Sequence, residues 1–376
     1  MRILVLADDF SGAAETAGIG WRFGLPVRLL RQPPKDVVFA GMTVVDTDSR
    51  GLAPSAAAER VRTYLRSTPR GSFDLVYKKI DSVLRGPVMA EVDAVARALK
   101  FTSALLLPQN PSRGRTIEGG VYRIDGIPLA ETEFARDPEY PARSSEVCEL
   151  LGPARLPVTV ANAATVDQVR AWAGAIDPTT LPVGGADFLR SILQLRGLHE
   201  HSERHIPALQ RPALIACGSA SARAAESAAR ARSIGLAIFP MPATDADRDP
   251  WIAAVARALR DHGRAMMTIH RPIDPAPDAP RRLTEQFTAA VRDVAILADP
   301  ATLLVAGGAT AAGVCDCLRM SSFEVTAELE AGVVALRAVT DNPDEPAVAG
   351  AESSPIIVVK PGSYPWPEEV WKLLAS

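Results

Sequence analysis

Cysteine is scarce in this sequence. It occurs only at Cys148, Cys217, Cys315 and Cys317, and none of these forms a C-x-x-C pair. No set of cysteines and histidines has the spacing of a zinc site. The sequence therefore excludes a small disulfide-stabilised fold and a zinc module, and it predicts a reduced, cytoplasmic protein.

The sequence also lacks long apolar runs and an excess of charge of one sign. The apolar run from Ile3 to Ala7 ends at Asp8, which makes it too short for a signal peptide or a membrane span. We expect a buried strand there and no membrane partner. Lysines and arginines (41) nearly balance aspartates and glutamates (44), and the net charge of −3 predicts no nucleic-acid partner.

Length and patterning predict a two-domain α/β protein. A chain of 376 residues exceeds one ordinary core, and short β-rich runs alternate with helical patterns in both halves. This predicts mostly parallel sheets flanked by helices. A charged segment before Pro207 and Pro212 indicates a boundary between domains 1–205 and 212–376. His201 and His205 leave a metal pair open there, but a solvated linker explains them better. A homo-oligomer stays open.

The expected elements follow from these patterns. In the first domain, strands are expected at 2–7, 42–46, 74–79, 103–108 and 157–161, and helices at 12–23, 54–65, 87–99, 165–175 and 187–198. In the second, strands are expected at 212–216, 236–241, 264–270, 302–306 and 355–360, and helices after 221 and near 250–262, 281–298 and 310–318. Helix 87–99 is the clearest because its valines form one apolar stripe, with Glu91 outside it.

Polar residues follow the expected strands of the first domain. Asp8 and Asp9 follow the first, Thr47–Arg50 the second, Lys78–Gly86 the third and Pro111–Thr116 the fourth. Parallel sheets bind ligands beyond the carboxyl ends of their strands. Adjacent carboxylates can hold Mg²⁺ or accept hydrogen bonds from substrate hydroxyls, although Asp9 can also simply cap the next helix.

The segment Lys78–Gly86 is the strongest of these signals. It places two lysines, Asp81, Ser82 and Arg85 at the end of an otherwise buried strand. A guanidinium suits a carboxylate or phosphate, and a lysine supplies a point charge. An ordinary solvated turn is the alternative. Together the strand ends combine acids, hydroxyls and cations, which suits a small polyhydroxylated anion.

Glycine-containing turns follow three expected strands of the second domain. They are Gly218–Ser221, Gly307–Gly313 and Lys360–Ser363. Glycines let the backbone approach phosphate, and a helix N-terminus supplies free N–H groups. A P-loop is excluded because Val314 and Cys315 stand where Lys-Ser/Thr is needed. Turns that only serve packing are the alternative, but three in one domain favour a nucleotide-phosphate site.

These segments together resemble the four-carbon acid sugar kinase family, formerly a domain of unknown function. The family's A-D-D-[FL]-[ST]-G-A is matched by residues 7–13, its T-x-S-R by 47–50 and its K-K-[IT]-D-S-x-L-R-G by 78–86. Residues 111–120 and Asp137-Pro138 continue the match. In the second domain, G-G-[ED]-T-S-G appears as 307–313 without the acid and the serine, and K-S-G-[GN]-F-G appears as 360–365 without the last glycine.

The resemblance implies ATP-dependent phosphorylation of a hydroxyl of a small, four-carbon sugar acid in a cleft between the two domains. The first domain would bind the sugar acid and the second would bind ATP with Mg²⁺. The implied substrate-binding residues are Asp8, Asp9, Ser49, Arg50, Arg85 and Arg115. The implied ATP-binding residues are Ser219, Gly307, Gly308, Ala309, Thr310 and Gly362. The implied catalytic residues are Asp81 as the base, Lys79 as a charge-neutralising group and Asp9 as the second candidate for the base.

Two other functions stay open. The departures from the family pattern at Ala309 and Pro365 leave room for a sugar-acid-binding regulator without phosphotransfer. A nicotinamide-dependent oxidoreductase ranks last, because no G-x-G-x-x-G follows an expected strand.

Overall fold

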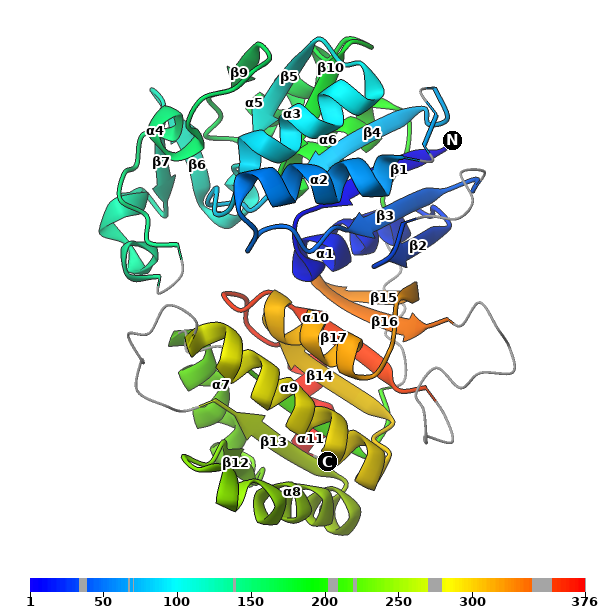
Figure 1. Cartoon of the computed structure of the whole chain (residues 1–376), viewed down its shortest axis with the longest axis vertical. Helices are drawn as coiled ribbons and strands as arrows, with labels where there is room; N and C mark the ends of the chain where they lie inside the picture. Colours follow the sequence, from blue (N-terminus) through cyan, green and yellow to red (C-terminus); the bar gives the residue numbers. More distant parts are fainter. Residues whose placement is uncertain are drawn as a thin grey trace. The chain divides into compact units, whose positions relative to one another are not determined.

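The chain forms two compact units, Met1–His201 and Ser202–Ser376. In this computed structural model, the structure describes residues 1–33, 39–66, 68–69, 71–137, 140–201, 209–218, 222–269, 279–339 and 354–375. Figure 1 colours the first unit from blue to green and the second from green to red. Within the described stretches, no helix is long and apolar enough to cross a membrane.

The first unit is built on a parallel sheet with the strand order β2-β3-β1-β4-β10-β5-β9. The strands are β1 (Ile3–Ala7), β2 (Val27–Leu30), β3 (Met42–Asp46), β4 (Leu75–Lys79), β5 (Ser103–Leu107), β9 (Val158–Val160) and β10 (Thr180–Gly184). Ala7 at the end of β1 lies beside Asp46 of β3 and Lys79 of β4, so the carboxyl ends of these strands are level. The polar turns that follow them therefore meet at one edge of the sheet.

Helices cover this sheet. They are α1 (Phe10–Arg22), α2 (Pro54–Leu65), α3 (Val88–Leu99), α5 (Val166–Gly174) and α6 (Ala186–Leu195), whereas the short helix α4 (Val147–Leu151) lies to one side of it (Figure 1). Helix α2 packs against α3, and α6 contacts both α1 and α5 (Figure 1). The apolar stripe of α3 is buried as expected, and Glu91, which lies outside the stripe, is only 1% exposed as well.

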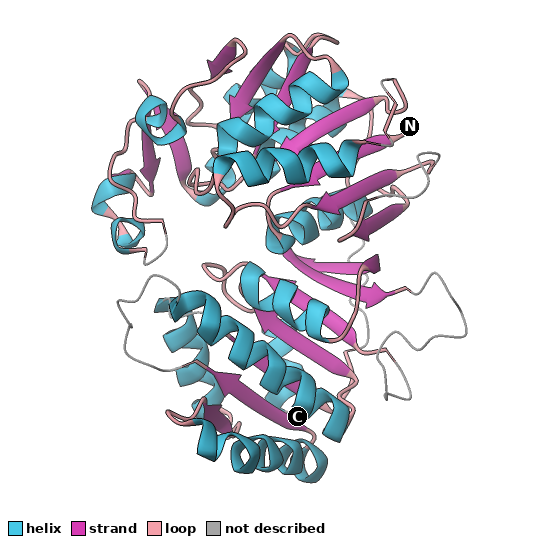
Figure 2. Cartoon of the chain, viewed as in Figure 1, coloured by secondary structure: helices cyan, strands magenta, loops and turns pink. Residues whose placement is uncertain are grey.

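A small antiparallel sheet interrupts the chain between β5 and β9 (Figure 2). Its strands are β6 (Arg115–Glu118), β7 (Val121–Ile124) and β8 (Ile127–Pro128). Two 3-10 turns, Leu129–Glu131 and Glu133–Arg136, then lead to Asp137. This excursion was not expected from the sequence, and it carries Arg115, Asp137 and Tyr140 to the polar edge of the large sheet.

The second unit has the strand order β12-β13-β11-β14-β17-β16-β15. The five strands β12, β13, β11, β14 and β17 are parallel to one another. Strand β16 pairs antiparallel with both β17 and β15. They are β11 (Ala213–Cys217), β12 (Ile238–Pro240), β13 (Arg264–Thr268), β14 (Thr302–Ala306), β15 (Ser322–Glu330), β16 (Val333–Ala338) and β17 (Ile356–Lys360). The helices are α7 (Ala222–Ser233), α8 (Arg248–His262), α9 (Ala279–Ala298), α10 (Gly308–Cys317) and α11 (Glu368–Ala375). The expected α/β class with mostly parallel sheets and flanking helices is confirmed.

Candidate active site

The polar edge of the first unit lies at a reversal of strand order. From β1 the chain builds β2 and β3 on one side of β1 and then crosses to β4 on its other side. Ligands of open parallel sheets bind at such a point, beyond the carboxyl ends of the strands. The turn after β1 supplies Asp8 and Asp9, and the turn after β3 supplies Arg50. The turn after β4 supplies Asp81 and Arg85.

Arg50 is the centre of this group. Its Nε donates to Asp8 Oδ2 (2.7 Å) and its Nη1 donates to Asp9 Oδ2 (2.8 Å), while Asp81 Oδ1 lies 3.6 Å from Nη1. The backbone of Arg50 is fixed as well, because Tyr140 Oη donates to its carbonyl (2.9 Å). Gly86 has a φ of +87°, and a Cβ there would lie 2.9 Å from the same carbonyl, so only glycine allows this approach.

Arg85 is tied to the turn from which it projects. Its Nε and Nη2 donate to the two carboxylate oxygens of Asp81 (2.8 and 2.9 Å), and its backbone N–H donates to Oδ2 (3.1 Å). Its Nη1 donates to Asp137 Oδ2 (3.1 Å). The guanidinium is 29% exposed, so a ligand can reach it from solvent.

The electrostatics of the group keep its carboxylates ionised. Burial would raise the pKa of Asp81, but Arg85 and Arg50 outweigh it and hold that pKa well below the ordinary range. The same balance, with Arg50 and Lys78 as the cations, lowers the pKa of Asp8. Burial would lower the pKa of Arg50, but its three carboxylate neighbours raise it well above its ordinary value.

The two lysines at the end of β4 point to opposite faces of the sheet, as successive strand residues must. Lys78 Nζ lies 2.8 Å from Glu91 Oε2 of α3, and both side chains are almost fully buried. Lys79 Nζ lies 3.3 Å from Glu15 Oε2 of α1. Because these side chains are buried, the solvated-turn interpretation of this segment is wrong. Each ammonium already has a carboxylate partner from the helix that covers it.

The remaining predicted residues of the first unit lie around this group. Asp9 caps α1 by accepting from Gly12 N (2.8 Å), so the capping interpretation is confirmed alongside its bond to Arg50. Ser49 is fully buried and shares a hydrogen bond with Thr47 (2.7 Å). Arg115 donates to Ser82 from β6. The structure thus brings all the predicted sugar-site residues to one edge of the sheet, and their roles stay predictions.

The carboxylates of this edge fit a metal ion poorly. The guanidinium of Arg50 occupies the position between Asp8, Asp9 and Asp81 that a cation would take. Across the described stretches of the chain, no group of three or more histidine, cysteine or acidic side chains is placed to hold a metal. The structure therefore gives no support to a Mg²⁺ site built by Asp8 and Asp9.

The second unit has its own reversal of strand order, between β11 and β14. Gly218 follows β11, and a Cβ there would overlap the side chain of Thr310 on α10. Gly307 follows β14 with a φ of +100°, and its N–H donates to the carbonyl of Lys360 at the end of β17 (2.9 Å). The turns after these three strands are therefore adjacent. Gly308, Ala309 and Thr310 form the first turn of α10, whereas Ser219 lies outside the described residues.

Lys360 is a buried cation beside these turns that was not expected as a site residue. Its Nζ donates to the carbonyls of Tyr364 (2.7 Å) and Pro361 (3.3 Å) and lies 5.2 Å from the centre of the Trp366 ring. Burial lowers its pKa to about 8. The lysine fixes the loop that contains Gly362. Its signal in the sequence was its place at the end of an apolar strand.

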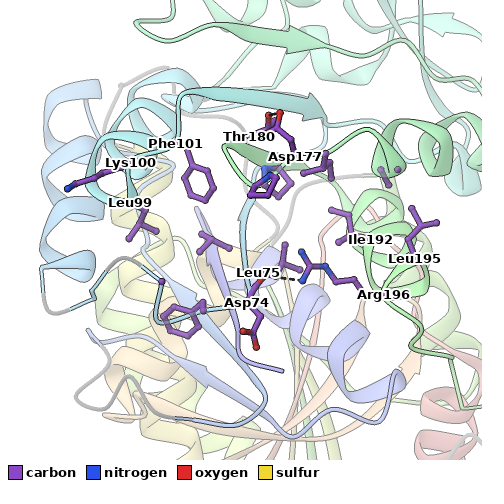
Figure 3. Close-up of a pocket in the computed structure, with 18 of the residues that line it drawn as sticks. Asp74, Leu75, Leu99, Lys100, Phe101, Asp177, Thr180, Ile192, Leu195 and Arg196 are labelled. Atoms are coloured by element: carbon purple, nitrogen blue, oxygen red, sulfur yellow. Dashed lines mark hydrogen bonds between the residues drawn. The ribbon is translucent and has the colours of Figure 1, made fainter.

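A cavity of about 630 Å³ lies elsewhere in the first unit (Figure 3). Asp74, Phe101 and Thr180 line it, and these residues stand where β4, β5 and β10 begin. Arg196 closes one side by donating to the carbonyl of Asp74 (3.0 Å). The cavity is thus at the amino-terminal edge of the sheet, opposite the polar turns, and it contains none of the predicted site residues.

Both halves of the chain resemble known proteins. A family model described as a sugar-binding N-terminal domain matches residues 3–183, and one described as a nucleotide-binding C-terminal domain matches residues 194–364. A D-threonate kinase of Salmonella typhimurium is 37% identical over 156 residues, which cover 40% of this chain and only 36% of that relative. A D-threonate kinase of Bordetella bronchiseptica is 29% identical over 369 residues, 88% of each chain.

A solved structure from Salmonella typhimurium LT2 has the same fold. It matches with a TM-score of 0.75 over 100% of this chain and 98% of its own, at 18% identity. The two family models together extend over both units. The chain belongs to the four-carbon acid sugar kinase family.

Proposed function

We propose that this chain is an ATP-dependent kinase that phosphorylates a hydroxyl group of a four-carbon sugar acid. The observation that carries the proposal is the continuous set of ion pairs Asp8–Arg50–Asp81–Arg85 beyond β1, β3 and β4. Fixed guanidinium groups flanked by carboxylates suit a small anion that also carries hydroxyls. The names of the relatives supply the substrate class, because they act on D-threonate, D-erythronate and 3-oxo-tetronate.

The sugar acid binds the first unit in this proposal. Arg85 and Arg50 are 29% and 17% exposed, so a substrate carboxylate can reach them. Asp9 is 13% exposed and can accept from a substrate hydroxyl beside Arg50. Ser49 is buried and supports the turn that carries Arg50. Arg115 holds Ser82 and so helps to fix the turn from Asp81 to Arg85.

ATP binds the second unit, with its phosphates against the N-terminus of α10. Gly308, Ala309 and Thr310 offer backbone N–H groups there, and Gly307 lets the chain turn into the helix, since its own N–H already donates to Lys360. The loop of Gly362 lies on the neighbouring strand end. Ser219 belongs to the same proposal by its place after β11. Mg²⁺ would accompany ATP and would neutralise charge on its phosphates.

Transfer then depends mainly on positioning and on neutralising charge. The paired arginines fix the acid so that one hydroxyl faces the terminal phosphate. A proton acceptor is a secondary requirement for a loose phosphoryl-transfer transition state. Asp81 and Asp9 are the candidates for it, and Lys79, whose ammonium pairs with Glu15 of α1, is the candidate for the charge-neutralising group.

The test is ADP release with a panel of acids. Purified protein with MgATP and D-threonate, D-erythronate or 3-oxo-tetronate should release ADP in proportion to phosphorylated acid, and omission of the acid should suppress release. The substitutions of the family pattern at Ala309 and Pro365 also permit a sugar-acid-binding regulator. Calorimetric binding of an acid without any ADP release would support the regulator and overturn the kinase.

Arg85→Ala tests the sugar site. We expect the affinity for the acid to fall about ten- to a hundred-fold, because a charge-assisted hydrogen bond contributes roughly 1.5–3 kcal/mol. The affinity for ADP should stay unchanged. The measurement is calorimetry with each ligand, with Arg62→Ala as a control because its guanidinium pairs with Glu59 on the exposed face of α2. An unchanged affinity for the acid would remove Arg85 from the site.

A further inference from the structure

Arg85 has one donor edge that Asp81 does not use. Asp81 accepts from Nε, Nη2 and the backbone N–H of Arg85, which leaves Nη1 for a ligand. In this structure Nη1 donates to Oδ2 of Asp137 at 3.1 Å. A carboxylate of the chain itself therefore occupies the position that a substrate carboxylate needs.

Asp137 is held at this position by its own segment. Its Oδ1 accepts from the backbone N–H of Tyr140 (2.9 Å), and its own N–H donates to the carbonyl of Phe134 (3.3 Å). The Phe134 ring lies 5.8 Å from the guanidinium carbon of Arg85. Tyr140 in turn donates to the carbonyl of Arg50. The segment thus contacts both arginines of the proposed sugar site.

We propose that Asp137 is an internal competitor of the substrate carboxylate for Arg85 and thereby sets the affinity of the site for acids. The proposal rests on the proposed function only in assigning the substrate carboxylate to Arg85. Two carboxylates at one N–H group repel each other, so an acid must displace Asp137 in order to bind. A hydroxylated acid has further contacts to Asp9 and Arg50 that offset this displacement. A plain anion has none, so the same competition leaves it bound only weakly.

The substitution Asp137→Asn separates competition from support. The amide keeps the size of the side chain and removes its charge. If Asp137 competes, the affinity for D-threonate should rise about ten-fold, the lower end of what a charge-assisted hydrogen bond contributes. Butyrate, a four-carbon acid without extra hydroxyls, should gain by a similar factor, whereas threitol, which has no carboxylate, should not change. Asp137→Ala, which retains no acceptor at all, should give at least the same gain.

Glu133→Gln is the matched control. It removes the same charge from the same segment, but Glu133 is exposed, and Arg85 pairs instead with Asp81 and Asp137. Calorimetry on the full chain measures each dissociation constant without ATP, and ADP release is measured separately. An affinity for D-threonate that is unchanged or lower in Asp137→Asn, or a gain of the same size in Glu133→Gln, overturns the competition. Absence of ADP release from the unaltered chain, with the affinity gain still present, overturns the kinase and leaves the competition standing.

Discussion

At the scale of single residues, the role of Asp81 needs to be decided between a proton acceptor and a group that orients Arg85. Both of its oxygens accept from Arg85, and its pKa lies well below the ordinary range. A carboxylate with such a low pKa is a weak proton acceptor at neutral pH. Its observed contacts instead orient Arg85 and, at 3.6 Å, assist Arg50. The base role assigned from the sequence stays a prediction, and these contacts favour an orienting role.

Asp81→Asn decides between the two roles. An orienting Asp81 predicts that the dissociation constant for the sugar acid rises about ten-fold or more, because the amide donors of Asn face those of Arg85. The single-turnover rate with both substrates bound then changes little. A base predicts a fall in that rate of roughly 10²–10⁴-fold with binding retained. Asp9→Asn, measured in the same way, serves as the comparison, and a rate loss specific to Asp81→Asn would restore the base.

Asp46 predicts a pH dependence of stability. It is buried at the end of β3, where Arg31 Nε (3.1 Å) and the N–H of Asp48 (3.0 Å) donate to it. Burial nevertheless raises its pKa to about 7, against about 3.9 in an unfolded chain. Between these values the folded chain binds a proton that the unfolded chain does not. This contribution to stability is complete below about pH 4 and is lost as the pH rises to about 7.

The free energy of unfolding of the unaltered chain, minus that of Asp46→Asn, should fall from pH 5 to pH 7 and become level above pH 8. Asn does not titrate, so the difference isolates the contribution of Asp46. Urea denaturation at each pH measures it. Asp48→Asn, in which Asn tolerates the left-handed φ of +46°, removes a neighbouring charge that helps to raise the pKa of Asp46, and it should therefore shift the loss to lower pH. A difference for Asp46→Asn that is constant across this range would contradict the raised pKa.

At the scale of elements, the turn from β14 to α10 gives the clearest prediction. Gly307 has φ +100° and ψ +136°, a region that residues with a Cβ rarely occupy. Gly307→Ala should lower the free energy of unfolding by about 1–3 kcal/mol. Gly308→Ala, one residue on and inside the helix, should raise it slightly, because alanine is the better helix former. Thermal midpoints of the two variants measure this difference. Equal midpoints would mean that the backbone at position 307 tolerates a Cβ.

The elements also show how far the sequence alone could lead. The apolar strands β1, β3, β4, β5 and β14 and the stripe of α3 were predictable, because a buried parallel strand is a short continuous apolar run. Strand β10 was missed, since Pro182 argues against a strand inside a sheet. The hairpin of β15 and β16 was missed although Val333–Ala338 is an apolar run. Its antiparallel pairing does not fit the expected alternation of strand and helix.

The sequence predicted the position of the site in the fold but not the ion pairs within it. Polar residues at strand ends marked its place, because the carboxyl ends of parallel strands share one edge. Their partners could not be predicted. Glu91 was expected only to lie outside the apolar stripe of α3, but the fold buries it against Lys78, and a buried charge requires such a partner. Asp137 was visible only as part of a motif, because the small sheet that brings it to Arg85 has short strands without a strong apolar pattern.

At the scale of the whole molecule, the division into two units predicts that the two substrates bind to separate stretches of the chain. The proposed sugar site uses turns after β1, β3 and β4, and the proposed phosphate site uses turns after β11, β14 and β17. Each site therefore lies at the strand ends of one sheet. A ligand that orders these turns should slow hydrogen exchange of their backbone amides.

Hydrogen exchange on the full-length chain tests this division. ADP alone should slow exchange in peptides that cover 213–218, 302–317 and 356–364 and leave 1–201 unchanged. D-threonate alone should slow exchange at 3–12, 42–50 and 75–86 and leave 212–375 unchanged. Arg85→Ala should abolish the second pattern and keep the first, because its guanidinium belongs only to the sugar site. Protection by ADP confined to 1–201 would overturn the assignment of the nucleotide to the second unit, since the backbone N–H groups of the α10 turn would then have no ligand to bind.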